Sequence, residues 1–254
     1  MLGVWFWTAT PGWGQTSEVT AAEGVRGKTA EADIEVALYS GPGVSDSIAR
    51  FDEDLRRVPR IRVRRLDLDQ IRSGGLEGVD VVVFPGGSGG GQGRGLGEEG
   101  RERVRKFVFG GGGYVGVCAG AYLATADYEW SLNLLDAKVL DRRHWARGFG
   151  NVELSVLPEA AKALGVERRM AVYYHQGPLL APAGREDLAD YREWAKFETE
   201  VRKEGVPGGV MPGTTAIAAG EYGEGRVLAI SPHPERTDAL NHVAALAVCW
   251  AAGK

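Results

Sequence analysis

One cysteine of the sequence stands where a nucleophile is expected. Cys118 lies in Gly116-Val117-Cys118-Ala119-Gly120, directly after a short apolar run and before a helical pattern. Small residues on both sides of a nucleophile are typical of a nucleophile elbow, a sharp and strained strand-to-helix turn. The helix dipole and the free N–H groups at such a turn favour a thiolate. The motif therefore predicts a reactive Cys118; the alternative is a buried structural cysteine in a turn of small residues.

A base with an orienting carboxylate follows late in the chain. His233 and Glu235 lie in Ser231-Pro232-His233-Pro234-Glu235, after an apolar run that predicts a strand. Prolines favour an extended chain before them, and residues two apart in an extended chain point to the same side. The imidazole and the carboxylate are therefore expected to lie together, as a base for a cysteine nucleophile requires.

A third segment could hold the negative charge that develops on a reacting carbonyl oxygen. Phe84-Pro85-Gly86-Gly87 ends a predicted strand with two glycines, which let backbone N–H groups approach a ligand closely. The N–H of Gly86 or Gly87 could then complete an oxyanion hole together with the N–H of Ala119. Taken alone, the segment is better explained as a turn at the end of a strand.

The elements that must position these residues alternate in the first half of the chain. Apolar runs predict strands over residues 34–39, 60–66, 80–84 and 114–118. Helical patterns separate the strands, while the glycine-dense segment 88–97 is expected to be a loop. Strands that alternate with helices predict a parallel sheet covered by helices on both faces.

The second half is less regular. Strands are expected over residues 151–156, 170–174, 216–222 and 226–231, and a final helix over about 237–251 buries Cys249 in the core. A stripe of apolar residues predicts an amphipathic helix over 187–203, inside an insertion near 182–209. This helix is expected to pack on the domain; the alternatives are a lid or a docking element for a partner. The stripe consists of Leu188, Tyr191, Trp194, Phe197 and Val201.

Together these motifs resemble the class I glutamine amidotransferase-like superfamily. Within it, the closer resemblance is to the domain at the N-terminus of eukaryotic biotin-protein ligases, which also occurs in stand-alone bacterial proteins. The motifs that carry the resemblance are residues 37–45, 83–87, 116–122, 173–178 and 231–235. The resemblance implies an α/β fold, a flavodoxin-like three-layer α/β/α sandwich with a mostly parallel central sheet, over residues 34–254.

The resemblance also implies roles for particular residues. Cys118 would attack a carboxamide carbon, His233 would carry the proton and Glu235 would orient His233. Backbone N–H groups near Gly86, Gly87 and Ala119 would hold the oxyanion, and Tyr122 and His175 would contact the substrate. True glutaminases carry a His-Gln pair, or a close equivalent, where this sequence has Ala121 and Tyr122. Free glutamine is therefore expected to be a poor substrate.

Three functions follow from this resemblance. The first is a glutamine amidotransferase-like cysteine hydrolase that acts on an unidentified small-molecule or peptide amide. The second is a non-catalytic binding or regulatory module that retains the pocket. The third is a glutaminase subunit that supplies ammonia to a separate synthase. A homo-oligomer or a synthase partner is compatible with all that the sequence shows.

Composition excludes several other classes of protein. The net charge of −4 argues against a general nucleic-acid binder. No dinucleotide motif lies in a strand–turn–helix context and the four histidines lack zinc-ligand spacing, so no cofactor and no metal are expected. No apolar run reaches the length of a membrane span. Residues 1–33 are expected to be a loosely ordered leader or the remnant of a signal peptide, which would make the protein cytoplasmic by default and exported in the second case.

Overall fold

A computed structural model of the chain describes residues 1–3 and 33–254. The leader predicted over residues 1–33 therefore lies almost entirely outside the described residues. Five parallel strands form the central part of the sheet in the order β2-β1-β3-β4-β11. Their bounds are β1 (Ile34–Tyr39), β2 (Ile61–Leu66), β3 (Val81–Phe84), β4 (Gly113–Val117) and β11 (Gly225–Ile230). All five agree closely with the strands predicted from the apolar runs.

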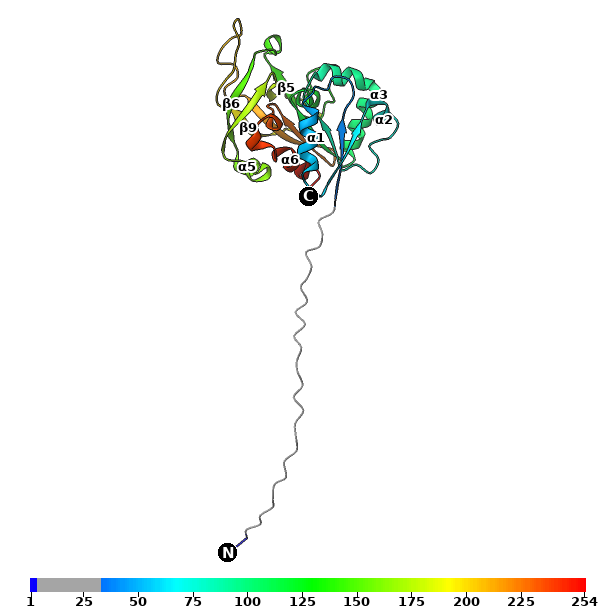
Figure 1. Cartoon of the computed structure of the whole chain (residues 1–254), viewed down its shortest axis with the longest axis vertical. Helices are drawn as coiled ribbons and strands as arrows, with labels where there is room; N and C mark the ends of the chain where they lie inside the picture. The colour runs from blue at the N-terminus through cyan, green and yellow to red at the C-terminus, as the bar shows by residue number, and fades with distance from the viewer. Residues whose placement is uncertain (4–32) are drawn as a thin grey trace. The chain divides into compact units, whose positions relative to one another are not determined.

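Alternate residues of these strands face two separate hydrophobic cores. Val36 and Leu38 of β1 pack in the core formed with α1 (Ile48–Arg56), α5 (Pro158–Leu164) and α6 (Val243–Ala251). Ala37 and Tyr39 face the opposite core, which contains α2 (Leu68–Arg72), α3 (Gly89–Phe109) and α4 (Ala119–Ala124). Figure 1 shows α1 and α6 on one side of the parallel strands and α2 and α3 on the other. The predicted three-layer sandwich is confirmed.

An antiparallel part extends the sheet beyond β11. Its strands follow in the order β10-β9-β6-β7, and β8 pairs with both β10 and β5. Neither β5 nor β8 was predicted from the sequence. The bounds are β5 (Ala137–Leu140), β6 (Phe149–Val156), β7 (Arg169–His175), β8 (Leu179–Pro182), β9 (Arg192–Phe197) and β10 (Thr215–Tyr222). Short 3₁₀ turns lie at η1 (Arg142–His144), η2 (Pro234–Arg236) and η3 (Asp238–Leu240).

The helix predicted over residues 187–203 is wrong, and so is the helical character of the insertion near 182–209. The segment contains the strand β9, which pairs with β10 through two register shifts. A bulge places an extra residue in a strand and interrupts its alternation. Trp194 and Ala195 are consequently both buried although they are adjacent, and Phe197 is buried three residues after Trp194. This spacing imitates a helical stripe.

The glycine-dense segment 88–97 is not the predicted loop, because α3 already begins at Gly89. Its glycines let the helix approach its neighbours backbone to backbone. A Cβ on Gly93 would lie 2.2 Å from the carbonyl oxygen of Trp130, and a Cβ on Gly89 would lie 2.9 Å from the Cβ of Tyr122. The low helix propensity of glycine is thus overcome by close packing that no larger residue allows.

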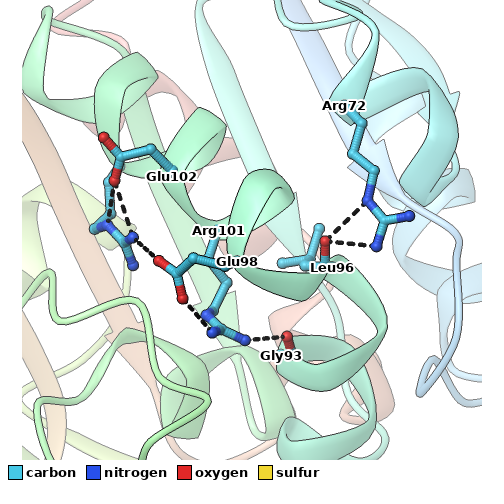
Figure 2. A network of polar contacts seen from close by, with 7 residues as sticks. Arg72, Gly93, Leu96, Glu98, Arg101 and Glu102 are labelled. Atoms are coloured by element: carbon cyan, nitrogen blue, oxygen red, sulfur yellow. Dashed lines mark hydrogen bonds and ion pairs between the residues drawn. The ribbon is translucent and has the colours of Figure 1, made fainter.

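A kink at Gly97 divides α3 into two segments. Gly97 has φ 64° and ψ −178°, a backbone conformation that favours glycine. Arginines bind the carbonyl groups that end the first segment (Figure 2). Arg72 donates to the oxygen of Leu96 at 2.8 Å, and Arg101 donates to the oxygen of Gly93 at 3.0 Å. Cations at the C-terminal end of a helix satisfy its unpaired carbonyls and its dipole, so these contacts fix the first segment in place.

Candidate active site

Cys118 lies at the turn between β4 and α4. Its backbone has φ 50° and ψ −97°, a sparsely populated conformation of the kind that stores strain at functional sites. The two neighbouring glycines make the turn sterically feasible. A Cβ on Gly116 would lie 2.4 Å from the carbonyl oxygen of Gly120, and one on Gly120 would lie 2.1 Å from that of Phe84. The turn thus has the tight geometry that a nucleophile elbow requires.

The backbone of Cys118 is tied to the strand that carries the base. Its N–H donates to the carbonyl of Ile230, the last residue of β11, at 2.8 Å. The thiol is 6% exposed and its sulfur lies 3.5 Å from the carbonyl oxygen of His175. Nucleophile and base therefore come from the adjacent ends of two parallel strands, at the carboxyl edge where open α/β sheets bind their ligands.

His233 and Glu235 lie together behind the cysteine. The ring nitrogen Nδ1 of His233 and Oε1 of Glu235 are 2.6 Å apart, and both side chains are buried. The chain is extended only as far as His233, because Glu235 belongs to the turn η2. The side chains nevertheless meet as expected. A carboxylate on Nδ1 leaves Nε2 of the imidazole for the cysteine, and Cys118 lies close enough to influence the pKa of His233.

The charges around His233 favour its protonated form. Burial lowers the pKa of His233, but the negative charge and hydrogen bond of Cys118 and the carboxylate of Glu235 outweigh burial and raise it to about 10. An imidazolium beside a cysteine sulfur is the environment that activates cysteine nucleophiles in proteins. The second oxygen of Glu235, Oε2, is buried and has no hydrogen-bond partner among residues 33–254.

Gly86 and Gly87 border the same site. A Cβ on Gly86 would lie 2.8 Å from Cε1 of His233, so only glycine leaves room for the imidazole. The neighbouring amides of Ser45 and Ser88 donate to the carbonyls of Gly86 and Gly43 and hold the segment. In residues 33–254 the N–H groups of Gly87 and Ala119 have no acceptor, which leaves both available for an oxyanion.

A cavity of about 800 Å³ opens over these groups. Cys118, His233, Gly87, Tyr122 and His175 all line it. The hydroxyl of Tyr122 donates to the carbonyl of Gln176 at 3.1 Å. Burial, with smaller contributions from His233 and Arg236, lowers the pKa of His175, so its imidazole is neutral at pH 7. The other predicted site residues lie next to those that line the cavity. Gly86 and Glu235 contact His233, and Ala119 directly follows the nucleophile.

Sequence reasoning missed most of the cavity wall. Four arginines and three further aromatic residues line it, and none was predicted to do so. The run Arg142-Arg143-His144-Trp145 does indicate a binding surface, since it combines cations with a large aromatic residue in an irregular segment. The missed residues are Arg94, Tyr128, Trp130, Arg142, Arg143, Trp145 and Arg236.

No metal-binding or membrane-spanning feature accompanies the cavity. Among residues 1–3 and 33–254, no group of three or more His, Cys, Asp or Glu side chains is arranged to hold a metal ion. No helix in the same part of the chain is long and apolar enough to cross a membrane.

Solved structures of several proteins have the same fold. PurLQS from Thermotoga maritima is 16% identical with a TM-score of 0.62, over 87% of this chain and 97% of that chain. A glutamine amidotransferase from the same organism is 15% identical with a TM-score of 0.52, over 81% and 77%. A cold-adapted β-galactosidase from Rahnella is 16% identical with a TM-score of 0.53, over 86% of this chain but only 31% of that chain. At such identities the likeness shows the fold alone.

The chain thus shares the fold of a solved glutamine amidotransferase. More specifically, residues 34–148 match the family described as biotin-protein ligase, N terminal. The family resemblance predicted from the motifs is confirmed. No curated protein sequence matches the chain. The matched segment contains Cys118 but ends before His233 and Glu235, so the assignment of these two residues rests on their geometry.

Proposed function

We propose that this protein is a cysteine-dependent hydrolase that cleaves a carboxamide through Cys118, His233 and Glu235. The observation that carries the proposal is the buried His233–Glu235 pair, 2.6 Å apart, beside the thiol of Cys118, with Cys118 and His233 lining a cavity large enough for a small-molecule ligand. The two unpaired N–H groups of Gly87 and Ala119 support it, because a reacting carbonyl needs such donors.

The proposed reaction has two stages. The sulfur of Cys118 attacks the amide carbon, and the N–H groups of Gly87 and Ala119 hold the oxyanion. His233 gives its proton to the departing nitrogen, so that an amine or ammonia leaves and a thioester remains. Water then attacks the thioester; His233 accepts a proton from this water, and the acid and the thiolate of Cys118 are released beside the imidazolium. Glu235 keeps the imidazole in the required tautomer throughout.

The reactivity of Cys118 tests this proposal without knowledge of the substrate. Iodoacetamide labelling of the native protein, followed at each cysteine by mass spectrometry across pH, should modify Cys118 well below the ordinary thiol pKa of ~8.5. His233→Ala should shift the pH profile of Cys118 upward, because the imidazolium is lost. Labelling of Cys118 only after denaturation would make the cysteine structural and favour a binding module.

Cys249 is a comparison site that needs its own control. It is buried on α6, as predicted, but the guanidinium of Arg60 donates to its sulfur at 3.2 Å, a contact that the sequence did not reveal. A nearby cation also favours a thiolate. Iodoacetamide labelling of a Cys249→Ala variant therefore reports on Cys118 alone. The pH profile of Cys118 labelling should be unchanged in that variant.

A glutaminase subunit is the second candidate, favoured by the likeness to PurLQS. Tyr122 argues against glutamine as the substrate, because its ring occupies the position of a hydrogen-bonding side chain and its hydroxyl is already bound to Gln176. A site that lacks the polar partners of a substrate discriminates against it strongly. Robust ammonia release from free glutamine by the isolated chain, absent in Cys118→Ala, would favour this second candidate.

A further inference from the structure

We infer that the cavity beside Cys118 binds an amide that carries an acidic group, carboxylate or phosphate, next to a planar apolar group. This inference rests on the proposed function and names the substrate class of the same site. Among the described residues, four arginines line the cavity and no aspartate or glutamate does. The whole chain carries 34 acidic and 30 basic residues, so the one-sided charge belongs to this cavity and not to the protein in general.

The arginines reach the cavity from separate elements. Arg94 projects from the first segment of α3, Arg142 and Arg143 lie in η1, and Arg236 ends η2. Segments distant in the chain thus bring like charges to one cavity, where their mutual repulsion is unfavourable until an anion enters. Such convergence is typical of sites that recognise carboxylate or phosphate, since guanidinium groups bind both oxyanions with paired hydrogen bonds.

In the part of the chain that the structure describes, three of the four guanidinium groups have no carboxylate partner. Arg142 is paired with Asp127 at 3.3 Å and lies over the ring of Tyr128 at 4.1 Å. Within residues 33–254, Arg94, Arg143 and Arg236 form no ion pair. These three side chains are the expected ligands of the acidic group.

Arg236 links the acidic group to the reacting centre. Its guanidinium lies over the ring of Tyr173 at 4.4 Å, and Nη1 lies 3.3 Å from Nδ1 of His175. His175 in turn accepts the thiol contact of Cys118 through its carbonyl oxygen. The arginine also directly follows Glu235 in the chain. An anion held by Arg236 would therefore lie on the side of the cavity that contains the nucleophile.

Aromatic side chains supply the second half of the site. Tyr128 and Trp130 are stacked with ring centroids 4.4 Å apart, and Tyr122 meets Tyr128 edge-on at 6.3 Å. Trp145 lines the same cavity and is 54% exposed. An exposed indole in a cavity that other aromatic rings also line gains from covering by a planar apolar group. The cavity therefore offers cations and an apolar surface in one volume.

Matched covalent probes test the inference. Three aryl iodoacetamides that differ only at the para position, with a carboxylate, a phosphonate or a neutral carboxamide, deliver the same reactive group to Cys118. At low salt we expect one or both anionic probes to label Cys118 at least about tenfold faster than the neutral probe, and the advantage to shrink as salt rises. Comparison of the two anionic probes distinguishes a carboxylate from a phosphate substrate.

Arginine variants show which side chains cause the preference for anionic probes. Combined Arg94→Gln, Arg143→Gln and Arg236→Gln should bring the ratio of anionic to neutral labelling close to one. The corresponding three Arg→Lys substitutions should retain part of the preference, because they keep the charge without the paired donors. Arg103→Gln, at an exposed position of α3 that does not line the cavity, should leave it unchanged.

The two proposals fail in different ways. Equal labelling by all three probes, or a preference that survives the triple Gln variant, would overturn the acidic-substrate inference while a fast Cys118 still supports the hydrolase. If Cys118 were unreactive toward every probe, the hydrolase proposal would fail. Anion binding would then be measured by calorimetry in Cys118→Ala, with N-benzoylglycine against its neutral amide. Preferential binding of the carboxylate that is lost in the triple Gln variant would support the inference, and equal binding would overturn it.

Discussion

At the residue scale, the site depends on how closely three side chains are held. His233 makes contact with both the sulfur of Cys118 and Oε1 of Glu235, and none of the three is free to rotate into solvent. A cysteine in a strained turn cannot relax without moving α4, which begins at the next residue. The positions of these atoms are therefore set by backbone geometry.

Glu235→Gln should preserve the fold and impair any Cys118-dependent turnover by roughly 10²–10⁴-fold, because the imidazole loses the anion that orients it and favours its protonated form. The labelling profile of Cys118 should move to higher pH in the same variant. Iodoacetamide kinetics and circular dichroism measure the two effects. Glu167→Gln, at an exposed position that does not line the cavity, is the matched control. Full retention of turnover and labelling by Glu235→Gln would remove the carboxylate from the mechanism.

Gly86→Ala should displace the imidazole, since the added methyl group would lie 2.8 Å from Cε1 of His233. A displacement of even an ångström at a reacting group can slow a reaction up to ~10²-fold, so we expect labelling of Cys118 to slow at least about tenfold. Gly110→Ala serves as the control, because its methyl group would meet nothing nearer than 3.3 Å. An unchanged labelling rate in Gly86→Ala would show that His233 does not set the reactivity.

At the element scale, the first segment of α3 forms one wall of the cavity and depends on its kink. Arg72 donates to the carbonyls of Gly95 and Leu96, which have lost their helical partners at Gly97. Arg72→Gln should lower the free energy of unfolding by about 1–3 kcal/mol, because charge-assisted bonds to these carbonyls are lost. Urea denaturation measures the loss, with Arg103→Gln as the exposed control on the same helix. Equal stability of the two variants would contradict this role of Arg72.

Sequence reasoning succeeded where the determinants are local. The elbow, the Gly86-Gly87 strand end and the His233–Glu235 pair each lie within a few residues, and the strands that carry them have continuous apolar patterns. It failed at β9, where a bulge changes the spacing of Trp194 and Phe197. It failed again at α3, where glycines serve close packing against segments remote in the chain. The arginine-lined wall was also missed, because it exists only once distant elements meet.

At the scale of the whole molecule, the buried imidazole couples stability to pH. The pKa of His233 is raised from 6.5 to about 10 in the folded state, so the folded protein holds this proton more tightly than the unfolded chain. The stabilisation from this group is therefore complete below about pH 6.5 and declines as pH rises toward 10. Denaturant midpoints measured across this range should fall, and they should fall less steeply in Cys118→Ala, which lacks the charge and hydrogen bond that raise the pKa. A decline just as steep in the variant would contradict the coupling.

The position of β11 in the sheet links the reactivity of Cys118 to the integrity of the fold. This strand pairs with β4 on one side and with β10 on the other, so it is the seam at which the parallel and antiparallel halves of the sheet join. The sulfur of Cys118 stands at the end of β4, and the imidazole of His233 follows β11. Sliding or opening between β4 and β11 therefore separates the two reacting atoms. A partner that displaces either half of the sheet would therefore lower the reactivity of Cys118 without touching the cavity. The reactivity of this thiol then also reports whether β4 and β11 remain paired.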